Sequence, residues 1–191
     1  VSGIILVLFA VGIIINYCRS IICKETVDYI SLKFFKRLAF YILWSFALTF
    51  AIGIPLAIFI MILSLMGVDA NTSLLLATIM FFVLGTILAP LLVGFPALAV
   101  DDYKLINLSK LFSLAKGNKI SIFFGQFVIM FPYMILSKMF MYIYIILGVN
   151  NYTVNLFFVV VTIFLGLIDA SFKGAFFAHV YQFLKYYDKD K

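Results

Sequence analysis

Residues 95–119 read FPALAVDDYKLINLSKLFSLAKGNK and form the longest polar interruption in an otherwise apolar chain. The stretch begins as the end of an apolar helix, and the adjacent carboxylates of Asp101 and Asp102 are suited to cap a new helix. The apolar positions of that helix fall on one arc of about 120°, with the lysines off the arc, and Gly117 predicts the left-handed residue that ends it. The arc positions are Leu105, Leu108, Leu111, Phe112 and Ala115. A cationic amphipathic helix between two membrane spans is expected to lie flat on the cytoplasmic surface.

The composition excludes a water-soluble globule. Of the 191 residues, 66% are hydrophobic and 12% are charged, and the mean hydropathy is +1.22. So little polar surface cannot cover a soluble fold, and the chain is expected to be a single integral membrane domain over residues 1–191, an all-α polytopic transmembrane helix bundle. The formal charge of +6 comes from basic residues between apolar runs, without a nucleic-acid-reading motif around them. An anionic phospholipid surface, and not nucleic acid, is therefore the expected partner.

Five apolar runs predict membrane-spanning helices, since each is about as long as a bilayer core requires or longer. They occupy about residues 1–17, 38–66, 73–93, 120–147 and 154–172. Two amphipathic surface helices are expected at about 24–37 and 102–116, and the last span is expected to continue as a helix to Tyr187. Prolines in or beside the spans predict hinges, because proline removes a helical hydrogen bond. These are Pro55, Pro90, Pro96 and Pro132.

Basic residues are confined to alternate connecting segments. The segments after the first, third and fifth spans hold five, four and at least three basic residues, while those after the second and fourth spans hold none. By the positive-inside rule, the three basic segments and the C-terminus are cytoplasmic, and Val1 lies outside. An outside start without a translocation signal predicts either an upstream helix absent from this sequence or a short translocated tail.

The basic residues of the two surface helices are candidates for binding anionic lipid headgroups. They are Lys24, Lys33, Lys36, Arg37, Lys104, Lys110, Lys116 and Lys119. The alternative is that these charges only set the topology.

A signature in residues 96–118 resembles a known family. It combines a proline-containing helix end, an acidic turn, a surface helix with a serine and a basic-Gly-Asn exit, at Pro96-Ala97, Val100-Asp101-Asp102, Leu108-Ser109-Lys110-Leu111, Leu114 and Lys116-Gly117-Asn118. This pattern is similar to the central signature of the bacterial YciC-like six-span membrane proteins, which is shared with the membrane domain of some glycerophosphodiester phosphodiesterases. Residues 178–184, AHVYQFL, are similar to the closing segment of that family.

The resemblance covers about half of the chain and implies a bacterial inner (plasma) membrane location and a sixth span preceding this sequence. It departs from the family around Ser109, where arginine and tryptophan are common and Lys110, Leu111 and Phe112 stand here. The family has no well-established reaction to carry over, and without a catalytic domain the phosphodiesterase activity is not implied.

Few residues suggest chemistry inside the membrane. Asp169 and Lys173 are four residues apart and share a helix face, so they predict a structural ion pair or, alternatively, a proton or ion site. His179 has no second ligand in helical register, which favours a packed or interfacial imidazole over a metal site. No motif for a nucleophile with its base, a phosphate loop or a cofactor is visible, so neither an enzyme nor a bound cofactor or metal is expected.

Small residues recur every four positions in the last helix, at Gly166, Ala170, Gly174 and Ala178. Such a stripe permits close helix approach, either within the bundle or against another subunit, a membrane protein partner or a second copy of the chain. The favoured function is a non-enzymatic accessory or structural subunit that binds partner helices and anionic headgroups. The alternative is a small-molecule or lipid transporter with Asp169 as its coupling site.

Overall fold

The structure, a computed structural model, describes residues 2–25, 31–147 and 152–187, and this part of the chain is helical without a strand. The long helices are α1 (Ser2–Cys23), α2 (Leu32–Leu65), α3 (Ala70–Leu88), α6 (Lys119–Leu147) and α7 (Tyr152–Tyr187). Short elements lie between α3 and α6, namely the 3₁₀ helix η1 (Ala89–Val93), α4 (Gly94–Ala99), the 3₁₀ helix η2 (Tyr103–Leu105) and α5 (Leu108–Leu114).

The expected all-α transmembrane bundle is confirmed. Within the described ranges, four helical segments are long and apolar enough to cross a membrane, at Leu32–Leu65, Ala70–Ala99, Lys119–Ile146 and Asn155–Lys185. The first expected span falls in α1, which contributes a shorter apolar stretch, Val7–Cys23. The protein is therefore built from apolar helices suited to integration in a membrane.

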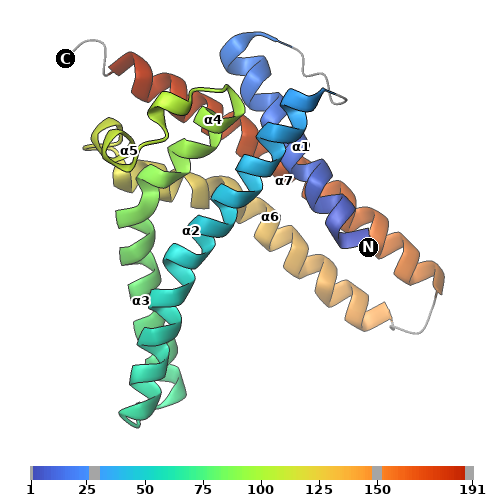
Figure 1. The fold of residues 1–191 in the computed structure, drawn as a ribbon. Helices are drawn as coiled ribbons and strands as arrows, with labels where there is room; N and C mark the ends of the chain where they lie inside the picture. Colours follow the sequence, from blue (N-terminus) through green and yellow to red (C-terminus); the bar gives the residue numbers. More distant parts are fainter. Residues whose placement is uncertain (1, 26–30, 148–151, 188–191) are drawn as a thin grey trace.

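The helices form two hairpins that diverge from a common end. In Figure 1, α2 and α3 make one hairpin, α6 and α7 make the other, and α1 lies along α7. The two hairpins separate as they leave the region of α4, which lies where they meet. Most of the long apolar faces therefore lie outside the protein core, since only 6% of the most apolar part of α2 is buried within the chain.

The core is centred on the interrupted helix that follows α3. Every residue from 89 to 99 is buried. Pro90 lies at the start of η1 and Pro96 lies in α4, so two of the four expected hinges lie in this buried segment. The other two, Pro55 and Pro132, lie inside α2 and α6, which continue through them. This segment belongs to the candidate span Ala70–Ala99. An irregular backbone within a membrane span is tolerated only when the protein itself surrounds it, as it does here.

Trp44 of α2 supports the interrupted helix. Its indole Nε1 donates a hydrogen bond to the Leu91 carbonyl at 2.9 Å. The indole also lies so close to Gly94 that an added Cβ would come within 2.6 Å of it, so only glycine fits there. Trp44 is therefore half-buried and packs against η1 and α4.

The expected surface helix at 102–116 is shorter and more deeply docked than predicted. Asn107, and not the aspartate pair, caps α5, accepting a hydrogen bond from the Ser109 amide at 3.0 Å. Leu111 and Ala115 are fully buried, so α5 docks on the protein core through these two residues. Gly117 has the left-handed conformation that its position predicted, with a φ of +84°.

The other expected surface helix, at 24–37, is in part the start of α2. Ser31 caps α2, accepting a hydrogen bond from the Phe34 amide at 3.2 Å, and residues 32–37 belong to this long helix. Residues 26–30 of the predicted helix lie outside the described residues. Helix α7 continues to Tyr187, as the sequence predicted.

Candidate functional site

The turn after α4 presents two adjacent carboxylates in different directions. Asp101 has a φ of +61°, in the left-handed region that aspartate tolerates better than most residues. The Asp102 amide donates to the Ala97 carbonyl at 2.9 Å, which holds the turn against the end of α4. As a result, Asp101 binds α1 and α2, whereas Asp102 binds α7.

Asp101 forms ion pairs with both arginines of the chain. Arg37 of α2 forms a two-pronged pair, from Nε to Oδ1 at 2.9 Å and from Nη2 to Oδ2 at 2.6 Å. Arg19 of α1 donates from Nη1 to Oδ2 at 3.3 Å and to the Ala99 carbonyl at 3.2 Å, and its Nη2 pairs with Glu25. A two-pronged arginine–carboxylate pair fixes orientation as well as distance, so this contact fixes α2 against the turn after α4, and Arg19 joins α1 to the same carboxylate.

Asp102 receives two groups from one turn of α7. The Tyr181 hydroxyl donates to Oδ2 at 2.5 Å, and Lys185 Nζ donates to the same oxygen at 3.0 Å. Lys185 also donates to the Tyr181 oxygen at 3.0 Å, and the Tyr181 side chain is fully buried. We call the six residues that meet at this turn the aspartate hub, consisting of Asp101, Asp102, Arg19, Arg37, Tyr181 and Lys185.

Both carboxylates of the hub are held in the charged form. The hydrogen bond from Arg37 lowers the pKa of Asp101 and outweighs the opposing effect of burial. Burial raises the pKa of Asp102. The hydrogen bonds from Tyr181 and Lys185 together lower this pKa by more than burial raises it, so it lies below the usual value for aspartate. Because each carboxylate is already bound by protein donors, the hub joins α1, α2 and α7 and is not an open reaction site.

The structure separates the headgroup candidates into two groups. Arg37 is buried and paired with Asp101, so it is not available to a headgroup, contrary to the sequence-based expectation. The seven lysines form no ion pair within the described residues. Six of them are exposed and Lys119 is half-buried, with its ammonium 5.1 Å from the Phe112 ring centroid. These lysines are Lys24, Lys33, Lys36, Lys104, Lys110, Lys116 and Lys119.

Asp169 and Lys173 do meet in α7. Lys173 Nζ lies 2.5 Å from Asp169 Oδ2. The carboxylate is buried, and among the residues of described position its second oxygen, Oδ1, has no hydrogen-bond partner. An unpartnered buried carboxylate oxygen is unusual, because it keeps the cost of leaving water without a compensating bond.

The stripe of small residues in α7 lies against α1 within the same chain. A Cβ added to Gly174 would lie 2.8 Å from Tyr17 Cβ and 3.1 Å from the Ile14 backbone. Cys18 Sγ contacts the Gly174 carbonyl at 3.5 Å, and Ala170 and Ala178 are buried. Gly166 differs, because a Cβ added there would meet no atom within 4 Å. Three of the four stripe positions are therefore buried within this chain.

The remaining candidate for ligand chemistry is isolated. His179 is exposed. Among the residues with described positions, no group of three His, Cys, Asp or Glu side chains is placed to hold a metal ion.

Comparisons with protein-family models, with curated proteins and with solved structures found no match for this chain.

The contacts that form the hub were not predicted from the sequence pattern. The pattern instead favoured Arg37 as a headgroup ligand and the two aspartates as a helix cap. The sequence held one signal, which is that the chain has only two arginines and otherwise uses lysine for its positive charges. Both arginines bind Asp101. Arginine suits a buried two-pronged carboxylate contact better than lysine does, so its sparing use marked positions inside the protein.

Proposed function

We propose that this chain is a non-enzymatic integral membrane protein whose hub end binds anionic lipid headgroups, and that it serves as an accessory or structural subunit. We place that end in the cytoplasm, following the distribution of basic residues. The resemblance to the YciC-like proteins would make the membrane a bacterial inner membrane. The observation that carries the proposal is the distribution of ion pairs at the hub end, where, in the part of the chain that the structure describes, the acidic side chains are paired and most of the lysines are not.

Within the described residues, the carboxylates at the hub end are in ion pairs, whereas seven lysines at this end are not. Asp101, Asp102 and Glu25 are paired with Arg19, Arg37 and Lys185. The seven lysines named above are left without a counter-charge from the described part of the chain. Each such lysine near an anionic leaflet contributes about 1 kcal/mol to association. The uncompensated charge therefore favours a leaflet rich in anionic phospholipid at this end.

The role of an accessory subunit has narrower support. The stripe in α7 is covered by α1, which leaves Gly166 as its open position. The apolar faces of the diverging hairpins are mostly unburied, which leaves surface for a partner helix or for lipid chains. A partner helix would therefore dock on the hairpins or at the Gly166 end of the stripe.

The lipid proposal is tested by neutralising the lysines of one segment. We expect phosphatidylglycerol, but not phosphatidylcholine, to raise the unfolding temperature of the detergent-solubilised protein, because a ligand that binds only the folded state stabilises it. Changing Lys104, Lys110, Lys116 and Lys119 together to glutamine is expected to remove most of this increase. Lys138→Gln, an exposed lysine of α6 away from the hub, is the matched control and is expected to keep it. An increase that survives the fourfold change contradicts headgroup binding.

Transport is the second candidate, because Asp169 Oδ1 is buried without a hydrogen-bond partner in the described part of the chain. A carboxylate that couples transport exchanges a proton or cation, so its occupancy should change stability. We expect the unfolding temperature to depend on sodium concentration in the wild type, and Asp169→Asn to remove that dependence. If the two proteins respond identically, Asp169 is only a structural partner of Lys173.

A further inference from the structure

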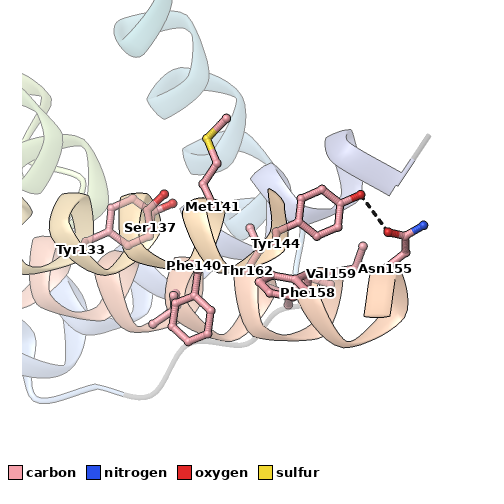
Figure 2. A pocket seen from close by; sticks show the side chains of 11 residues that line it. Tyr133, Ser137, Phe140, Met141, Tyr144, Asn155, Phe158, Val159 and Thr162 are labelled. Atoms are coloured by element: carbon pink, nitrogen blue, oxygen red, sulfur yellow. Dashed lines mark hydrogen bonds between the residues drawn. The ribbon is translucent and has the colours of Figure 1, made fainter. Parts of the chain in front are cut away.

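A cavity of about 400 Å³ lies between the second half of α6 and the first half of α7, far along the hairpin from the aspartate hub. Figure 2 shows Tyr133 and Ser137 near one end of the cavity and Tyr144 with Asn155 at the other. The Tyr144 hydroxyl donates to Asn155 Oδ1 at 2.8 Å and joins the two helices there. The volume lies within the range of ligand-binding pockets.

Besides Tyr144, three residues with a hydroxyl group line this cavity, namely Tyr133, Ser137 and Thr162. Within the described residues, no hydrogen bond joins any of the three to another protein group. Other hydroxyls in these helices do bond to the carbonyl four residues earlier, namely those of Thr49, Thr78, Thr86 and Ser171. A hydroxyl facing hydrocarbon without a partner is unfavourable, so the cavity offers three hydrogen-bonding groups to an occupant.

The cavity is uncharged and has aromatic walls. None of its 11 lining residues is ionisable at neutral pH. Phe140 of α6 and Phe158 of α7 pack edge to face with ring centroids 6.2 Å apart, and the Tyr144 ring lies 5.0 Å from Phe158. A charged headgroup would lose its hydration here without gaining a counter-charge. The lining therefore suits an uncharged polar group attached to an apolar body.

The cavity is open from the side. Ser137 and Met141 of α6 and Val159 and Thr162 of α7 are exposed on the membrane-spanning surface. A molecule dissolved in the bilayer can reach the hydroxyls from there without crossing water. The occupant is therefore expected to come from the membrane itself.

We propose that the groove between α6 and α7 binds a neutral acyl lipid with a free hydroxyl beside its ester carbonyls, of the diacylglycerol type. The protein hydroxyls can both donate and accept. A lipid hydroxyl and an ester carbonyl answer both needs, whereas a quinone can only accept. The acyl chain packs along the aromatic walls. This site is separate from the anionic headgroups proposed at the hub, because it lies at the other end of the hairpin and carries no charge.

The test uses the full-length protein in nanodiscs and a diacylglycerol with a photoreactive diazirine in one acyl chain. We expect labelled peptides to come from α6 and α7, and unlabelled diacylglycerol to compete. The double change Ser137→Ala and Thr162→Val removes two hydroxyls and is expected to lower labelling about thirtyfold, the effect of losing two ordinary hydrogen bonds. The matched control, Thr78→Val, removes a hydroxyl that is already bonded within α3 and is expected to leave labelling unchanged.

Each other outcome overturns part or all of the proposal. Labels that map to helices other than α6 and α7 place the lipid elsewhere, whatever the variants do. Equal loss in the Thr78→Val control shows that the effect is not local to the cavity. Competition by phosphatidylglycerol as strong as that by diacylglycerol contradicts a neutral site, and competition by a quinone alone contradicts the need for a ligand hydroxyl. The lysine changes at the hub end are expected to leave labelling unaltered, so the two lipid proposals can fail separately.

Discussion

Asp101→Ala removes the carboxylate on which two helices converge. Arg37 then loses two hydrogen bonds, at 2.9 and 2.6 Å, and Arg19 loses one at 3.3 Å. The helices themselves keep all their backbone bonds. Alanine tolerates a φ of +61° less well than aspartate does, so the loss of stability combines the lost pairing between helices with local backbone strain, and a double-mutant cycle separates the two.

The size of the effect follows from the exposure of each partner. A buried charge that loses its partner costs about 3–5 kcal/mol. The Arg37 side chain is 8% exposed and meets that description, but Asp101 is 38% exposed, so water already screens part of the attraction. We expect the free energy of unfolding to fall by about 2–3 kcal/mol, below the fully buried case.

A double-mutant cycle separates the ion pair from other effects of the substitution. Arg37→Met removes the charge but keeps an apolar side chain of similar length, so the double variant contains no unpaired Arg37. Its loss is expected to be smaller than the sum of the two single losses, with a coupling energy of at least about 1 kcal/mol. The assay is equilibrium unfolding of the full-length protein in mixed micelles of dodecylmaltoside and sodium dodecyl sulfate.

Lys110→Met is the control, because Lys110 is exposed and forms no ion pair within the described residues. Its free energy of unfolding is expected to stay within about 0.5 kcal/mol of the wild type. A loss below about 0.5 kcal/mol for Asp101→Ala, or an additive cycle, would refute the reasoning, since the helices would then be held together without the hub.

Three other changes probe the stripe, the interrupted helix and the titration of the hub. Gly174→Leu forces α1 away and is expected to cost at least about 2 kcal/mol in the same unfolding assay. Gly166→Leu is the control, because a Cβ at Gly166 meets open space and should cost little. Equal losses in the two variants would contradict the packing of α7 against α1. Trp44→Phe removes the bond to the Leu91 carbonyl and is expected to cost about 1 kcal/mol, and an unchanged midpoint would contradict that role. Both hub carboxylates have lowered pKa values, so their contribution to the free energy of unfolding is complete above the ordinary aspartate pKa of about 3.9 and is lost as the pH falls below it. Replacing both with asparagine is therefore expected to make stability fall less steeply in acid.

Local patterns predicted most of the helices. Apolar runs of sufficient length required a helix wherever the chain meets hydrocarbon, because only a helix satisfies its own backbone there. Gly117 predicted its left-handed turn for an equally local reason, the absence of a Cβ. The surface helix at 102–116 was predicted too long, since its capping residue depends on what else competes for Asp101 and Asp102. The four-residue spacing of Asp169 and Lys173 predicted their pairing, because both lie on one helix.

The sequence by itself therefore determined the class of protein, the nature of its long elements and the gathering of lysines in alternate segments. Each depends on properties of neighbouring residues, namely hydropathy, helical period and charge. Only the tertiary structure decided that Arg37 is buried against an aspartate 64 positions away, that α1 covers the stripe at Gly174, and that Ser137 and Thr162 share one cavity. Those contacts depend on which helices pack together, and a hydropathy pattern is the same whether an apolar face meets lipid or another helix.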